Sequence, residues 1–128
     1  MCLIFFSVQK HARYPLIIAA NRDEFYARQT AAAGFWPEDE RILAGRDLEA
    51  CEPQRGCGTW LGVNRNGRLA LVTNYRDPKN INPKAPSRGH LVSAYLRGAD
   101  EPEHYLHKLL PEAPRYNGFN LVVGDAHQ

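Results

Sequence analysis

The cysteine at position 2 is the first residue whose type and place could support catalysis. A small residue at this position normally leads to removal of the initiator Met1, which leaves a free α-amine on the residue that carries the thiol. Such an amine has an unperturbed pKa near ~7.7–8.0, so it can serve as the base for its own side chain. Cys2 is therefore a candidate nucleophile. The structural alternative is a buried apolar residue that opens a strand.

A second candidate group is the polar segment Asn21-Arg22-Asp23-Glu24, which directly follows the apolar segment 15–20. An Asp here could accept a hydrogen bond from an N-terminal ammonium and tune its pKa, so Asp23 is a candidate catalytic residue. Arg22 could hold a carboxylate or phosphate in bidentate fashion, and Asn21 and Glu24 are further candidates for substrate binding. The alternative is a charged turn whose members pair with one another in solvent.

A third candidate group is the segment Thr73-Asn74-Tyr75-Arg76-Asp77. The amide of Asn74 could stabilise a developing oxyanion, which would make it catalytic, and Tyr75 and Arg76 are candidates for contacting the substrate. The alternative is a turn, since Asn and Asp favour turns through local hydrogen bonds.

Hydrophobic patterns predict the elements that must position these residues. Residues 3–9 and 15–20 are predicted to form a hairpin, and residues 59–64 and 68–74 a second one around Arg65-Asn66-Gly67. Residues 21–40 are predicted to be an irregular connection with a helical turn, and 41–46 a short strand. Two helices follow, one capped by Ser87 and running to about Arg97 and one from about residue 100 to 110, before a last strand at 119–124. This order predicts an α+β fold with antiparallel sheets.

The amino-acid composition of the chain argues against several classes of protein. The chain has 128 residues, 44% hydrophobic and 23% charged, with a formal net charge of +2, as expected for one globular domain. Its basic residues are scattered among acidic ones, which argues against nucleic acid as a partner. No apolar run reaches the roughly 20 residues of a membrane span, so we expect a cytoplasmic protein. Three cysteines do not make a disulfide framework, and neither they nor the dispersed histidines show a zinc spacing, so we expect no metal and no cofactor.

Several motifs in one order resemble the NRDE family, which is also the transport and Golgi organisation protein 2 family. They are Met1-Cys2, Ala20-Asn21-Arg22-Asp23-Glu24, Thr59-Trp60-Leu61-Gly62-Val63-Asn64, Gly67-Arg68, Leu71-Val72-Thr73-Asn74-Tyr75-Arg76, Ser87-Arg88-Gly89 and Tyr116-Asn117-Gly118-Phe119-Asn120-Leu121-Val122-Val123-Gly124-Asp125. The family in turn resembles the N-terminal-nucleophile (Ntn) hydrolases of the penicillin V acylase and bile-salt hydrolase type. That resemblance implies an αββα sandwich of two antiparallel sheets between helical layers, with Cys2 as nucleophile, Asp23 at its amine and Asn74 in the oxyanion hole.

This sequence departs from the Ntn hydrolase and NRDE family patterns at three points, which limits how far their residue roles apply to it. The acylases have an Arg three residues before the Asp, where this chain has Ala20, and the stretch from Cys51 to Cys57 looks inserted. The chain also covers about half of the family's length. We therefore expect residues 1–128 to be a single Ntn-like domain truncated at its C-terminus, whose sheets would be completed by the missing half or by another copy of the chain.

Two functional hypotheses follow from the residues and the resemblance. The first is an amidohydrolase in which Cys2 attacks the carbonyl carbon of a linear or cyclic amide. The second is a non-catalytic carrier, because the resemblance to eukaryotic relatives implies a role in haem trafficking or in lipid and acyl-CoA handling. A third possibility is an inactive fragment. Whether the chain is an enzyme stays open at this level.

Overall fold

The computed structural model describes residues 2–125 and has the α+β class predicted from the sequence. The chain begins with an antiparallel hairpin of β1 (Ile4–Val8) and β2 (Leu16–Ala20), which forms a two-stranded sheet of its own. Ile4 pairs with Ala20 at its open end and Val8 with Leu16 near its loop. The open end of this hairpin therefore brings residue 2 next to the polar segment that follows β2.

The remaining strands form a six-stranded antiparallel sheet. They are β3 (Thr30–Trp36), β4 (Asp39–Glu52), β5 (Gly56–Gly58), β6 (Leu61–Asn64), β7 (Leu69–Asn74) and β8 (Phe119–Gly124). The order across the sheet is β3-β4-β6-β7-β8, with β5 paired to the end of β4. The last strand in sequence pairs with β7 along its whole length, so it lies at one edge of the sheet.

The turn between β6 and β7 confirms the hairpin predicted from Asn66-Gly67. Gly67 adopts a φ of 82°, and its N–H donates to the carbonyl of Asn64 at 3.1 Å. The side chain of Asn64 also accepts hydrogen bonds from the N–H groups of Asn66 and Arg68. The left-handed conformation falls on the glycine of the loop 65–68, because a glycine has no Cβ to oppose it.

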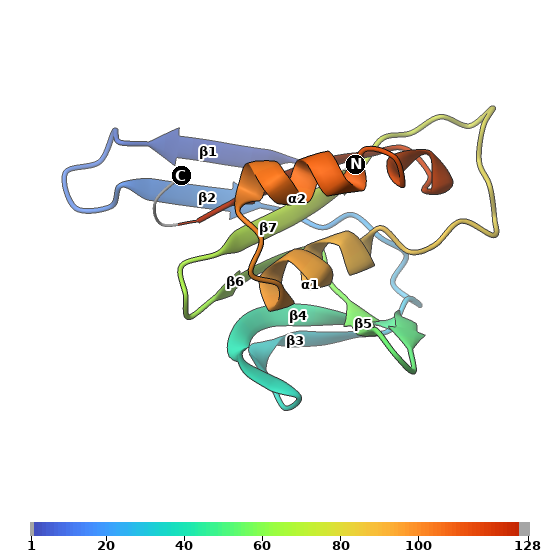
Figure 1. Cartoon of the computed structure of the whole chain (residues 1–128), viewed down its shortest axis with the longest axis horizontal. Coiled ribbons are helices and arrows are strands. Elements are labelled where there is room, and N and C mark those ends of the chain that lie inside the picture. The colour runs from blue at the N-terminus through green and yellow to red at the C-terminus, as the bar shows by residue number, and fades with distance from the viewer. Residues whose placement is uncertain (1, 126–128) are drawn as a thin grey trace.

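Two helices cover one face of the large sheet: α1 (Gly89–Arg97) and α2 (Pro102–Leu109), followed by a short 3-10 turn at Ala113–Arg115 (Figure 1). The core lies between α1 and the strands. Its buried members are Trp36, Ile42, Ala44, Ala70, Val72, Val92, Tyr95 and Leu96. The helix can approach closely because Gly62 has no side chain, since a Cβ there would lie 2.6 Å from a methyl carbon of Leu96.

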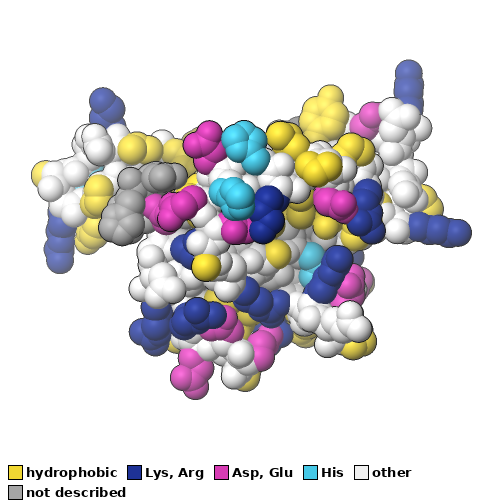
Figure 2. Space-filling model, viewed as in Figure 1, with side chains coloured by type: hydrophobic (Ala, Val, Ile, Leu, Met, Phe, Trp, Pro, Cys, Tyr) yellow, Lys and Arg dark blue, Asp and Glu magenta, His cyan; other side chains and the backbone are white. Residues whose placement is uncertain are grey.

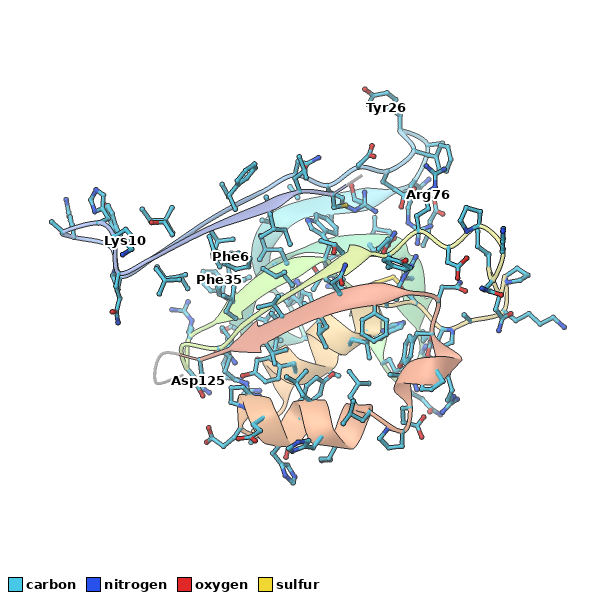
Figure 3. The ribbon with its side chains drawn as sticks, turned by 90° about the horizontal axis from the view of Figure 1, so that it is seen from above. Phe6, Lys10, Tyr26, Phe35, Arg76 and Asp125 are labelled. Carbon is cyan, nitrogen blue, oxygen red and sulfur yellow. A yellow bond between two sulfur atoms is a disulfide. The ribbon has the colours of Figure 1, made fainter. Side chains whose placement is uncertain are left out.

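The β1–β2 hairpin lies over the opposite face of the large sheet, so the described chain has three layers: hairpin, sheet and helices (Figure 3). Phe6 belongs to β1 of the hairpin, and Phe35 belongs to β3 at an edge of the large sheet. Both remain about half exposed, at 47% and 50%. The hairpin therefore covers this face of the sheet only loosely.

Two sequence predictions about residues 21–52 were wrong in extent. The region predicted as an irregular connection contains β3, and the short strand predicted at 41–46 is part of a strand of 14 residues. Residues 30–36 include three alanines and a glycine, which have low β-propensity, and their strand forms because β4 pairs with it. The helix predicted from Ser87 begins instead at Gly89, with Arg88 at the N-cap. The other predicted elements are confirmed, with bounds shifted by a few residues.

Residues on opposite faces of β4 should differ sharply in their contribution to stability. Ile42 is fully buried against α1, whereas the neighbouring Leu43 is 37% exposed on the hairpin side. We expect Ile42→Ala to lower the free energy of unfolding by about 2–5 kcal/mol, because it removes buried methyl groups and leaves a cavity. Leu43→Ala should cost clearly less. Urea unfolding of both variants checks this, and equal losses would contradict the assignment of the core to the helical face.

Candidate functional site

Two adjoining cavities lie at the end of the molecule where β2 and β7 end and α1 begins. One has a volume of about 580 Å³ and is mainly polar, and the other has about 1030 Å³ and includes several apolar and aromatic side chains. Six residues line both: Cys2, Asp23, Glu24, Asn74, Arg88 and Asn117. The three residues predicted to be catalytic, Cys2, Asp23 and Asn74, are thus brought together from three separate segments of the chain.

Cys2 is held beside the segment that follows β2. The backbone N–H of Asp23 lies 3.4 Å from its Sγ and donates to it. Leu3 donates its N–H to Oδ1 of Asn21 at 2.6 Å, and the N–H of Asn21 donates back to the carbonyl of Leu3 at 3.1 Å. Asn21, predicted to bind substrate, is not among the residues that line either cavity. In this structure it braces the backbone next to Cys2.

The two other polar residues of that segment face the smaller cavity and belong to a charged network. The guanidinium of Arg22 lies 4.6 Å from the ring centre of Trp60 and 3.7 Å from a carboxylate oxygen of Asp47. Arg28 donates to the same carboxylate through Nε and Nη2 at 3.0 Å, and its Nε lies 4.0 Å from Glu24. Burial opposes the charge on Arg28, but its carboxylate partners outweigh that effect and raise its pKa. The network holds Arg22 and Glu24 in place at the cavity wall.

The third predicted group forms one side of the larger cavity. Asn74, Tyr75 and Arg76 all line it, and the N–H of Tyr75 donates to the carbonyl of Gly118 at 2.9 Å. Tyr75 is 62% exposed, so its ring is available to a ligand. Figure 3 shows Arg76 at the same end of the molecule as Tyr26, far from the loop of the first hairpin. The alternative of a simple turn does not describe Asn74, which is the last residue of β7.

Sequence reasoning missed two basic residues at the start of α1. Arg88 lines both cavities, and its Nη1 donates to the carbonyl of Gly118 at 2.8 Å. His90 is 4% exposed and lines the smaller cavity, with its Nε2 3.2 Å from a carboxylate oxygen of Glu52. Burial lowers the pKa of His90, although the carboxylate of Glu52 opposes this shift. The Ser-Arg-Gly motif was the available signal for Arg88, and nothing in the sequence pattern marked His90.

A disulfide joins Cys51 and Cys57, which sequence analysis did not expect. The two residues are directly paired on β4 and β5, so the register of the sheet places them opposite each other across a tight turn. An odd number of cysteines argues against a framework of several disulfides but is compatible with one. The pairing of Cys51 with Cys57 could not be predicted, because it depends on β5, a strand of three residues. Cys51 lines the smaller cavity, whereas Cys2 is the free cysteine among the described residues.

This arrangement offers a thiol, carboxylates, an amide and guanidinium groups around two adjoining cavities. Within residues 2–125, no three His, Cys, Asp or Glu side chains come together in a way that could hold a metal ion. The removal of Met1, on which the nucleophile hypothesis depends, concerns a residue outside the described ones. The site can therefore bind a polar or charged group close to Cys2, next to a wider and more apolar space.

The ordered motifs are those of the NRDE family, and comparison with known proteins agrees. The model of the family described as Transport and Golgi organisation 2 matches residues 1–128, so the chain belongs to that family. It is 46% identical over 130 residues to the Transport and Golgi organization protein 2 homolog of Bos taurus, covering 98% of this chain and 45% of the relative. The Homo sapiens homolog is 45% identical with the same coverage, and the Drosophila melanogaster protein is 37% identical, covering 100% of this chain and 48% of the relative. The chain thus spans about half the length of these relatives.

The surface adds two observations about partners. Neither helix within residues 2–125 is long and apolar enough to cross a membrane. On the helical face, basic and acidic side chains are interspersed (Figure 2). One ion pair on this face, between Lys108 and Asp100 at 2.8 Å, illustrates the pattern.

The cysteine pairing can be tested by counting thiols. Native protein treated with iodoacetamide without reductant should gain a single adduct, mapped to Cys2, because Cys51 and Cys57 are bonded to each other. After reduction and denaturation, all three cysteines should react. Intact mass spectrometry with peptide mapping measures both states. Labelling of Cys51 or Cys57 without reductant would contradict the bridge.

Proposed function

We propose that this chain forms the ligand-binding part of a non-catalytic carrier of the transport and Golgi organisation type, which holds a small amphipathic organic molecule such as a haem, a lipid or an acyl-CoA. The observation that carries this proposal is the pair of adjoining cavities, one polar and one lined partly by aromatic and aliphatic side chains. The polar end of such a ligand would fit the smaller cavity, and its apolar body would fit the larger one.

The larger cavity supports the apolar half of that ligand. Phe25, Tyr75 and Ile81 line it and are 84%, 62% and 62% exposed. Covering large exposed apolar side chains with a ligand removes them from water, and this burial contributes favourably to the free energy of binding. The polar groups that line both cavities, including Asn74 and Asn117, would then meet the hydrophilic end.

We further propose that residues 1–128 supply the N-terminal half of an Ntn-like αββα sandwich. The three layers of this chain correspond to helices, a first sheet and the start of a second sheet. Phe5 and Val8 of the hairpin are 66% and 57% exposed, as expected for strands that would pair and pack with further chain. The relatives, about twice as long, contain enough additional residues to complete such a sheet.

Binding and its dependence on the aromatic wall test the carrier proposal. Isothermal titration calorimetry with decanoyl-CoA and with haemin should give saturable binding of at least one of them to the native chain. Tyr75→Ala should raise Kd by about tenfold, since an aromatic contact contributes on the order of 1 kcal/mol beyond its buried area. The matched control is Tyr14→Ala, because Tyr14 is also exposed but lines neither cavity. Absence of binding, or equal loss in both variants, would reject the carrier.

The second candidate function is a cysteine amidohydrolase, which the position of Cys2 favours. Its thiol shares both cavities with Asp23 and Asn74, and the N–H of Asp23 points at its sulfur. In this mechanism the Cys2 thiolate attacks the amide carbon, its α-amine transfers the proton to the leaving nitrogen, and water releases the acyl group. Catalysis would additionally require the α-amine to be free.

Substitution of the thiol separates the two functions. If the protein hydrolyses amides, Cys2→Ala should abolish turnover of a panel of N-acyl amides and lactams while leaving Kd for decanoyl-CoA or haemin within about twofold. The variant removes only a sulfur atom at a partly exposed position, so folding should be retained. Cys2→Ser serves as the control that keeps the shape. Turnover that survives in Cys2→Ala would eliminate Cys2 as the nucleophile.

A further inference from the structure

Within the described part of the chain, Arg88 differs from Arg22 and Arg28 of the smaller cavity in having no carboxylate at ion-pair distance. Arg22 and Arg28 both contact the carboxylate of Asp47. Among residues 2–125, the guanidinium of Arg88 forms no ion pair, and the hydrogen bond found for it goes to a neutral carbonyl, that of Gly118. A guanidinium carries five N–H donors, so most of its capacity remains for another group.

The surroundings of Arg88 make an incoming anion favourable. Partial burial lowers the pKa of Arg88, with the attraction of Glu24 opposing that shift and the repulsion of Arg28 adding to it. An arginine keeps its charge in any case, so an approaching anion would further offset the cost of removing this charge from water. His90, two residues further along, is buried with no hydrogen-bond partner for its Nδ1 and also lines the smaller cavity. Arg88 thus offers donors to an incoming anion, and the free Nδ1 of His90 is a second polar atom without a partner beside the same cavity.

The backbone holds Arg88 in a fixed position. Gly89 packs against the strand linker so closely that a Cβ there would lie 3.0 Å from the backbone nitrogen of Thr59, and that nitrogen donates to the carbonyl of Gly89 at 3.3 Å. The bond to Gly118 fixes the other end of the side chain. A preorganised fork of donors loses little conformational entropy when a carboxylate or phosphate binds to it.

We propose that Arg88 binds the anionic group of the ligand, a carboxylate or a phosphate attached to an apolar body. Arg88 lines both cavities, so an oxyanion held by its guanidinium lies at their junction near Cys2, and the apolar body extends into the larger cavity along Tyr75 and Phe25. This inference deepens the carrier function and rests on it. It assigns the recognition of charge to the N-cap residue of α1, whereas Arg22 and Arg28 are held by Asp47 and keep the cavity wall in place.

Matched probes with one alkyl chain and different head groups test the proposal. Calorimetric titration of the native chain at pH 7.5 with decanoate, decyl phosphate and decanol should show at least tenfold tighter binding of the two anions. Arg88→Gln should remove that advantage and leave decanol binding within about twofold. Arg88→Lys should keep an intermediate advantage, because it retains the charge without the planar fork. Arg13→Gln is the control, since Arg13 is exposed and lines neither cavity.

The outcomes separate this inference from the carrier function. Unchanged anion binding in Arg88→Gln, or equal weakening of the anions and decanol, would overturn the role of Arg88 while leaving the carrier intact. Absence of binding for all three probes would overturn both. If Arg88→Gln fails to fold, modification of the native chain with phenylglyoxal replaces it: decanoate and decyl phosphate should protect Arg88 from the reagent, whereas decanol should not. Equal protection by decanol would overturn the proposal.

Discussion

The close packing of helix α1 on the large sheet is the contact on which the rest of this structure depends. Val92, Tyr95 and Leu96 of the helix are almost completely buried against β4, β6 and β7. The approach is possible because the sheet presents Gly62 under Leu96, where any side chain would collide with the helix. Buried apolar contacts of this kind supply the main favourable term in folding, and their close packing allows one arrangement of the elements. The start of α1 is thereby fixed at one end of the sheet.

That fixed start explains where the cavities lie. The residues before and at the beginning of α1 form one wall, the end of β7 forms another, and the segment after β2 closes the third side. Polar groups on the first two walls are thus positioned by the core. Cys2 is different, because it reaches the cavities from the hairpin, which covers the sheet with half-exposed residues such as Phe6. The geometry around the thiol depends on how firmly the hairpin is held, and further chain packed on it would make that geometry more rigid.

Buried and partly buried charges give the site its second constraint. Arg68 lies deep beside the core with a carbonyl partner at each end of its guanidinium, those of Tyr95 and Asp100, and its charge lies 3.9 Å from the ring centre of Tyr95. Arg28 is instead satisfied by Asp47 and its acidic neighbours. Both arginines are thus held by several contacts within the protein, whereas the guanidinium of Arg88, among residues 2–125, has one hydrogen bond and no ion pair, which is the basis for proposing it as a place for an external anion.

The sequence by itself determined the α+β class, both hairpins, both helices and the family, because alternating apolar residues, Asn66-Gly67 and ordered motifs are local signals. It also identified Cys2, Asp23 and Asn74 as candidate catalytic residues. Only the tertiary structure decided that these three line common cavities, that β3 exists as a partner of β4, and that Cys51 and Cys57 are bonded. Each of these depends on contacts between segments distant in sequence or on the register of a short strand. His90 and Arg88 belong to the same category, since burial and the lack of an ion pair among residues 2–125 are properties of the folded neighbourhood and leave no trace in local residue patterns.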